Sequence, residues 1–250
     1  AGESIFLLGP PGVAKSLVAR RLKLAFKDAD AFEYLMSRFS TPDEIFGPVS
    51  ISKLKDEDTY ERITKGYLPT ASIVFLVINE KIYRNGQFTV RVPLKALIAA
   101  SNELPAKGEG LEALYDRFLI RQFVGCIEQE YAFDQMISST REVEPEIPAK
   151  LQVDDELYNQ IQAESEKVGI HYTIFELIHN IKREIEQYNT GRDENTPPIY
   201  ISDRRWKKIV GLLRTSAYLN ESPGIHFSDC LLMSACLWDE VSQLPIIENI

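Results

Sequence analysis

A short segment near the start of the chain combines glycine, lysine and serine at a spacing suited to binding phosphate. Residues 9–16 read GPPGVAKS, directly after an apolar run at residues 5–8 and directly before a stretch with helical periodicity. Glycines let the backbone turn so that several N–H groups converge on phosphate oxygens, and the positive end of the following helix adds to the attraction. Lys15 would reach the terminal phosphates, and the Ser16 hydroxyl would bind Mg²⁺. The strand, loop, Lys-Ser pair and helix together favour a phosphate loop over an ordinary Gly/Pro turn that caps a helix.

One position of this loop departs from the strict phosphate-loop pattern, which has glycine where this chain has Ala14. The position should lie at the start of the helix, where a small side chain is expected to suffice. We therefore expect the phosphates of a nucleotide to contact the whole loop and the residue after it: Gly9, Pro10, Pro11, Gly12, Val13, Ala14, Lys15, Ser16 and Leu17.

The elements that must position this loop differ between the two halves of the chain. Up to about residue 125, short apolar runs of strand type alternate with helix-length segments, and they lie at residues 5–8, 32–35, 73–76, 97–100 and 119–124. Such spacing is typical of βαβ units with a buried parallel sheet. After about residue 130, apolar residues recur at helical spacing in three stripes, over residues 174–185, 206–217 and 231–238. An α/β domain followed by a smaller all-helical domain is predicted.

Composition narrows the cellular setting and the partners. The 250 residues carry 28 basic and 37 acidic side chains, a net charge of −9, which weighs against broad attraction to nucleic acid or anionic lipid. No apolar run approaches the roughly 18 residues of a membrane span. Three scattered cysteines are too few for a disulfide framework or a zinc site. These features favour a cytoplasmic protein, and we do not expect nucleic acid to be its partner.

Beyond the phosphate loop, an ordered series of motifs resembles the MoxR branch of AAA+ ATPases, and within it the group called RavA. Residues 39–48 and 60–69 resemble the flanks of an insert in the second helix of that family, and residues 79–93 resemble the hairpin before its sensor 1 strand. Three further segments resemble sensor 1, the arginine-finger motif and sensor 2: residues 100–103 (ASNE), 114–118 (LYDRF) and 202–206 (SDRRW). The resemblance implies a P-loop AAA+ three-layer αβα nucleotide-binding domain over residues 1–125 and a helical lid domain over residues 126–250.

The resemblance also implies ATP/ADP and Mg²⁺ as cofactors and a role for each matching residue. Lys15 would hold the β- and γ-phosphates, and Ser16 would hold Mg²⁺. Asn102 would orient the attacking water, because it follows a strand at the carboxyl edge of the sheet, beside the loop. The alternative for Asn102 is an asparagine that only closes a turn at a strand end.

Two arginines complete the implied catalytic set. Arg117 would act in the site of the neighbouring subunit and stabilise charge in the transition state; its alternative is a surface salt bridge with its acidic neighbour. Arg121 is a weaker candidate for such a contact between subunits. Arg204 matches the sensor 2 position better than Arg205, just after a predicted helix N-cap at Ser202. For this pair the alternative is a solvated first helical turn.

The chain departs from the family pattern after the third apolar strand, where an acidic Asp-Glu pair is expected. Residues 72–76 (SIVFL) run directly into residues 77–81 (VINEK), of which Asn79 and Glu80 resemble the end of the next helix, just before the hairpin. A crossover between parallel strands needs a dozen or more residues, and none is available there. We therefore hypothesise that about 15 to 20 residues are absent between Leu76 and Val77, and Glu80 receives no catalytic role.

The function predicted from this resemblance is an ATP-hydrolysing motor with chaperone-like or remodelling activity on protein complexes. The family norm is a hexameric ring that acts with a partner carrying a von Willebrand factor A (VWA) domain, and RavA-like members are linked to an inducible lysine decarboxylase. Two alternatives stay open. One is a nucleotide-gated scaffold that does not hydrolyse ATP, should the acidic pair be truly missing, and the other is a DNA-handling AAA+ motor, against which the net charge weighs.

Overall fold

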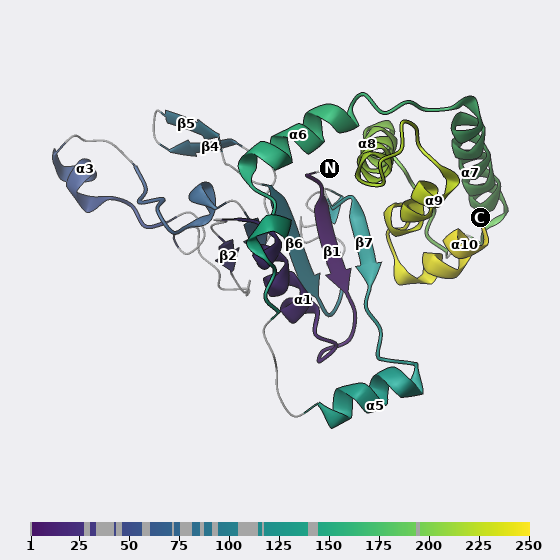
Figure 1. Cartoon of the computed structure of the whole chain (residues 1–250), viewed down its shortest axis with the longest axis horizontal. Helices are drawn as coiled ribbons and strands as arrows, with labels where there is room; N and C mark the ends of the chain where they lie inside the picture. The colour runs from purple at the N-terminus through teal and green to yellow at the C-terminus, as the bar shows by residue number, and fades with distance from the viewer. Residues whose placement is uncertain are drawn as a thin grey trace. The chain divides into compact units, whose positions relative to one another are not determined.

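The computed structural model (Figure 1) describes residues 2–27, 31–33, 43, 47–56, 61–71, 73–75, 82–85, 88–91, 95–104, 115–116, 118–139, 145–193 and 196–250. The chain divides into two compact units. Residues 4–118 and 124–154 form the first, which we call the phosphate-loop unit, and residues 1–3, 119–123 and 155–250 form the second, the helical unit. The predicted domain boundary between residues 125 and 126 stays a prediction.

A parallel sheet carries the first half of the chain. Its five strands, in the order β2-β3-β6-β1-β7, are β1 (Ser4–Leu8), β2 (Ala31–Glu33), β3 (Ile73–Phe75), β6 (Ala96–Ser101) and β7 (Ile120–Phe123). The pairs β1–β6, β3–β6 and β2–β3 are all parallel. Buried apolar side chains on β1 and β6 explain why these runs form the centre of the sheet. All five predicted strands are therefore confirmed, and β7 clusters with the helical unit.

Helices and a hairpin complete the phosphate-loop unit. Helix α1 (Lys15–Leu22) packs Ala19 against Leu7 of β1 and Ile98 of β6. The predicted hairpin is confirmed, because β4 (Ile82–Asn85) and β5 (Phe88–Arg91) pair antiparallel. Among the described residues of this unit, further α-helices are α3 (Ile51–Asp56) and α5 (Glu130–Ser138), and short 3-10 helices span Lys23–Ala25, Leu68–Thr70 and Ala149–Leu151.

The helical unit follows the predicted periodicity in its two long helices. Its α-helices are α6 (Asp155–Ser165), α7 (Tyr172–Gly191), α8 (Asp203–Leu219), α9 (Phe227–Cys230) and α10 (Leu244–Asn249). Ile174 and Ile185 of α7 are buried, as are Ile209 and Leu213 of α8. The predicted combination of a parallel α/β sheet with a helical part is thus confirmed. In the described part of the chain, no helix is long and apolar enough to cross a membrane.

The third predicted stripe folds differently from the expectation. After α9, residues Leu231–Cys236 form a 3-10 helix, and a further one covers Val241–Gln243. A 3-10 helix has three residues per turn, so every third side chain shares a face. Cys230, Met233 and Cys236 are accordingly buried, whereas Leu231 is 75% exposed. The assumed period of 3.6 residues therefore assigned Leu231 wrongly to the core.

Candidate nucleotide site

The phosphate loop lies between β1 and α1, as predicted. Gly9 continues from β1, and its N–H donates to the Ser101 carbonyl at 3.3 Å. A Cβ added to Gly9 would lie 2.0 Å from the carbonyl oxygen of Val124, so no larger residue fits there without moving the backbone. Gly12 has a φ of +86°, the left-handed conformation that glycine adopts without strain. Both loop glycines are thus explained, Gly9 by the close approach of Val124 and Gly12 by its backbone conformation.

Ala14 occupies the position where the family pattern has glycine, and it explains that preference. The residue is the N-cap of α1 and has φ 61° and ψ 17°, in the left-handed region. A side chain with a Cβ costs about 1–2 kcal/mol in this conformation. The expectation that this position lies at the helix start is confirmed, and alanine there is accommodated with backbone strain.

Lys15 is the buried cation of the site. Its ammonium group donates to the carbonyl oxygens of Gly9 at 2.8 Å and Pro10 at 2.7 Å, and to Asn102 Oδ1 at 3.0 Å. The contact between Lys15 and Asn102, 87 positions apart, follows from the sheet. Leu8 and Ser101 are register partners in the parallel pair β1–β6, so the residues after them emerge at the same edge. The two residues predicted to face the γ-phosphate therefore lie together.

The charge balance of this site fits a phosphate ligand. Lys15 is 6% exposed, and its three acceptors are all neutral oxygens. The first turn of α1 contains no acidic residue, and its N-cap, Ala14, has no side-chain oxygen that could accept from the first N–H groups of the helix. A buried cation normally has an anionic partner, and a helix N-terminus attracts negative charge. The loop, with Ser16 exposed on the same turn, therefore suits the phosphates of a nucleotide with bound Mg²⁺.

The segment around Arg117 is described on both sides, although Arg117 itself lies outside the described residues. The N–H of Phe118 donates to the Tyr115 carbonyl at 3.1 Å. Both aromatic rings pack on Phe6 of β1, with centroid distances of 5.1 Å for Tyr115 and 5.4 Å for Phe118. Aromatic contacts to the central strand thus hold Tyr115, two positions before Arg117, and Phe118, directly after it. The role of Arg117 stays a prediction.

The arginines of the helical unit separate into exposed and buried groups. Ser202 caps α8, as predicted, by accepting a hydrogen bond from the Arg205 N–H. Arg204 is exposed on the first turn of this helix, whereas Arg205 is buried and paired with Asp239. Arg121 is buried as well and forms an ion pair with the same carboxylate. The expectation of a contact between subunits through Arg121 is therefore wrong, because its guanidinium is enclosed within the helical unit.

Two features of the site could not have been found from motif spacing. The approach of Val124 to Gly9 joins residues 115 positions apart in the chain, and the pairing of Asp239 joins it to arginines 118 and 34 positions away. Neither Val124 nor Asp239 belongs to a local pattern. The acidic pair expected after β3 also stays untested, because residues 76–81, Glu80 among them, lie outside the described residues.

Comparison with protein families gives matches over most of the chain. The model described as "MoxR domain in the MoxR-vWA-beta-propeller ternary systems" matches residues 1–77 and 75–163. An AAA lid domain model matches residues 173–250. The two stretches of the first match meet at residues 75–77, where the segment between Leu76 and Val77 is predicted to be absent. This break supports that hypothesis without locating the acidic pair.

Two archaeal proteins and a viral protein are similar in sequence. The uncharacterized protein MJ0079 of Methanocaldococcus jannaschii is 37% identical over 266 residues, which cover 100% of this chain and 66% of the relative. MJ0812 of the same organism is 39% identical over 259 residues, covering 97% of this chain and 65% of the relative. The structural protein ORF618 of Acidianus two-tailed virus is 30% identical over 142 residues, 49% of this chain and 23% of the viral protein. The chain thus spans about two thirds of the length of its archaeal relatives.

A solved structure shares the fold. The crystal structure of a presumed ATPase from Cytophaga hutchinsonii superposes with a TM-score of 0.69 and 17% sequence identity, over 99% of this chain and 84% of the other. At this identity the likeness concerns the fold alone. It agrees with the α/β sheet and the helical lid expected from the sequence.

Proposed function

Because this chain belongs to the MoxR branch of the AAA+ ATPases, we propose that it binds ATP with Mg²⁺ at the phosphate loop and hydrolyses it to ADP and phosphate. The observation that carries this proposal is the buried ammonium group of Lys15. It lies at a helix N-terminus, and its acceptors among the described residues are neutral oxygens, one of them from Asn102. Within the described part of the chain this cation has no anionic partner, and the phosphates of the nucleotide would supply one.

The proposed roles of the loop residues follow from their positions. Lys15 would neutralise charge on the β- and γ-phosphates, and the loop N–H groups would bind their oxygens. Asn102, 3.0 Å from Lys15, would orient the attacking water with its side-chain amide. Ser16 would give one oxygen ligand to Mg²⁺, which would itself neutralise charge on the phosphates in the transition state. Most of this chemistry is positioning and electrostatic stabilisation, which suits a loop with no nucleophile.

The two arginines of the motifs would complete the site. Arg204, exposed at the start of α8, would bind the γ-phosphate from the lid of the same chain. Arg117 would reach the site of the next subunit in a head-to-tail ring, and six subunits are the family norm. Repeated head-to-tail contacts close into rings when the rotation permits. The aromatic contacts of Tyr115 and Phe118 support this role, because an arginine finger must be held at a fixed place.

The proposed work of the motor is remodelling of protein complexes in the cytoplasm. The description of the matching family names vWA and β-propeller components, which supports a VWA-domain protein as the partner. An inducible lysine decarboxylase is a further predicted partner, and it rests on the resemblance to the RavA group only. Co-purification of the full-length protein with a co-expressed VWA-domain protein, compared with the Lys15→Ala variant, would test the partner class.

A second candidate function is a nucleotide-gated scaffold that binds ATP without hydrolysing it. The observation that favours it is the sequence after β3, which contains no Asp-Glu pair at residues 76–81. In AAA+ enzymes this acidic pair supports Mg²⁺ and activates water, so its loss would leave binding intact and stop turnover. ATP binding without any turnover by the full-length protein would select this function.

The experiment that tests the proposed function compares Lys15→Ala with Lys27→Ala. Both variants remove one lysine from the same unit, but Lys27 is exposed and outside the loop. We expect Mg²⁺-dependent ATPase activity of the full-length protein to fall about 100-fold or more in Lys15→Ala and to stay within twofold in Lys27→Ala. A correctly folded Lys15→Ala protein that binds and hydrolyses ATP at the parent rate would refute the assignment of the phosphate loop.

A further inference from the structure

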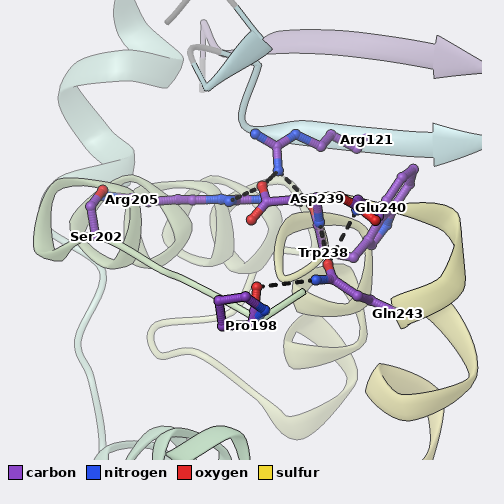
Figure 2. A network of polar contacts seen from close by, with 8 residues as sticks. All are labelled: Arg121, Pro198, Ser202, Arg205, Trp238, Asp239, Glu240 and Gln243. Carbon is purple, nitrogen blue, oxygen red and sulfur yellow. Dashed lines mark hydrogen bonds and ion pairs between the residues drawn. The ribbon is translucent and has the colours of Figure 1, made fainter. Parts of the chain in front are cut away.

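Four hydrogen bonds in the helical unit converge on one short turn. Arg121 of β7 donates to the Trp238 carbonyl at 2.6 Å and to Asp239 Oδ1, and Arg205 of α8 donates to the same two oxygens at 3.0 and 2.9 Å. Figure 2 shows the Asp239 carboxylate next to both guanidinium groups, with Arg205 reaching it from α8 and Arg121 from above it in this view. We call Arg121, Arg205, Trp238 and Asp239 the arginine clip.

Burial makes the arginine clip rigid. Arg121 is 1% and Arg205 4% exposed, so neither guanidinium can be satisfied by bulk water. Buried charges need a charged or hydrogen-bonded partner, and the attraction between them is strong where water is excluded. Loss of Asp239 would leave two buried cations without their shared carboxylate. Strand β7 and the start of α8 are therefore held at a fixed separation.

Gln243 holds the turn of the clip from its other side. Its amide oxygen accepts from the N–H groups of Asp239 at 2.7 Å and Glu240 at 3.2 Å, and its amide nitrogen donates to the Pro198 carbonyl at 3.2 Å. Gln243 is 1% exposed, so these bonds are protected from solvent. The same glutamine thus joins the Asp239 turn to the segment that leads into α8 (Figure 2).

Arg204 lies in the middle of this fixed structure but takes no part in the hydrogen bonds of the clip. Ser202, the N-cap of α8, accepts a hydrogen bond from the Arg205 N–H at 3.2 Å. Arg205, which directly follows Arg204, is buried in the clip. The backbone of Arg204 is therefore held on both sides, while its side chain is exposed. A fixed backbone with an exposed side chain suits a residue that must contact a ligand at a defined place.

We propose that Asp239 is a positioning residue for Arg204: the arginine clip fixes the first turn of α8 to β7, so that the backbone of Arg204 is held in one place within the helical unit. This inference rests on the proposed role of Arg204 at the γ-phosphate.

The test is a double-mutant cycle in the full-length protein between Asp239→Asn and Arg204→Ala, with ATP turnover and ATP affinity measured separately. Asparagine keeps the shape and an acceptor oxygen but loses the charge. We expect Asp239→Asn to lower kcat about tenfold in the parent and less than twofold in the Arg204→Ala background, because a positioning residue has nothing left to position there. ATP affinity should change less than kcat in the parent background.

Lys208→Met is the matched control for a purely structural effect. Lys208 also anchors α8, through its bond to Glu3 at 2.5 Å, but it lies one turn beyond Arg204. We expect it to leave kcat within twofold. If Asp239→Asn does not fold, Arg121→Met takes its place in the cycle, since it removes the β7 anchor and leaves the Arg205–Asp239 pair.

Three outcomes would overturn the proposal. Equal losses of kcat from Asp239→Asn in both backgrounds would make the clip a structural support only, and so would an equal loss of kcat in Lys208→Met. If Arg204→Ala keeps the parent kcat while Lys15→Ala still abolishes turnover, Arg204 takes no part in hydrolysis and the clip cannot act through it. Retained turnover in Lys15→Ala would instead refute the proposed function itself, so the two failures are distinguishable.

Discussion

The two units of this protein each bury positive charge, and they satisfy it in opposite ways. In the phosphate-loop unit, Lys15 is enclosed with two backbone carbonyls and the Asn102 amide oxygen, all of them neutral. In the helical unit, Arg121 and Arg205 share the carboxylate of Asp239. Burial alone therefore does not distinguish a ligand-binding cation from a structural one. The charge of the partner distinguishes the two kinds of cation, because a cation bonded to neutral oxygens keeps its attraction for an incoming anion.

The same contrast orders the arginines by function. Arg121 and Arg205 are committed to Asp239, whereas Arg204, adjacent to Arg205, is exposed at the start of α8. A guanidinium already paired in a buried site cannot reach a nucleotide without leaving an unpaired carboxylate. Arg204 is free of that cost, which supports it over Arg205 as the residue directed at the γ-phosphate.

Arg117 is expected to give the largest effect, since it would add a cation from another subunit to the Lys15 site. We expect Arg117→Ala to lower kcat about a thousandfold or more and to leave ATP binding intact. Mixing Arg117→Ala with Lys15→Ala subunits should restore hydrolysis, because some interfaces then pair an intact Lys15 with an intact Arg117. Subunit exchange is followed by fluorescence energy transfer in the same samples. No recovery despite exchange, or full activity from a dilute monomer, would contradict action in trans.

The reactivity of the three cysteines offers a measure of burial and of the charges in the arginine clip. Cys126 is exposed, and burial raises the pKa of Cys230, helped by the charge of Asp229. Burial raises the pKa of Cys236 from an ordinary 9.0 to about 12, although the charges of Arg205 and Arg121 oppose the rise. At pH 8 we expect a thiol reagent to label Cys126 rapidly and Cys236 at least about a hundredfold more slowly.

Removing the carboxylate of Asp239 should make Cys236 react faster with the thiol reagent. Asp239→Asn leaves two guanidinium groups without their anion, which lowers the pKa of the Cys236 thiol and makes it react faster. The folded state holds this thiol protonated, so its contribution to stability is present below about pH 9 and is lost as the pH rises toward 12. Labelling followed by mass spectrometry would detect either effect, and equal labelling of Cys126 and Cys236 in the native parent would contradict the burial.

The two buried cationic sites should differ in stability when their charges are disturbed. Asp239→Asn is expected to lower the free energy of unfolding by about 2 kcal/mol, because the half-buried carboxylate is the shared anion of two buried guanidinium groups. Lys15→Met removes a buried cation whose acceptors among the described residues are all neutral, so we expect a change of less than about 1 kcal/mol. Urea unfolding followed by circular dichroism compares them, and a larger loss from Lys15→Met would reverse our assignment of the two sites.

The smallest predicted effect concerns the strained N-cap of α1. Ala14→Gly relieves the left-handed conformation but adds chain entropy to the unfolded state, so we expect a gain of about 0.5 kcal/mol. Ala14→Val should lower stability by about 1–3 kcal/mol, since a branched side chain tolerates this conformation poorly. Thermal unfolding of the two variants would show opposite shifts, and equal shifts would contradict the strain at Ala14.

Local patterns in the sequence were sufficient for the strands, the phosphate loop, the hairpin and the cap at Ser202. Each depends on covalent geometry and on the period of burial over a few residues, which neighbouring residues determine. The period of three in residues 231–236 escaped this reasoning, because a 3-10 helix is chosen by its packing and not by its composition. The sequence also predicted Asn102 beside the phosphate loop, because both follow strands of one parallel sheet. Tertiary structure alone decided that the Val124 carbonyl lies against Gly9 and that Asp239 binds Arg121 and Arg205. These partners lie 34 to 118 positions apart, and only the folded chain brings them into contact.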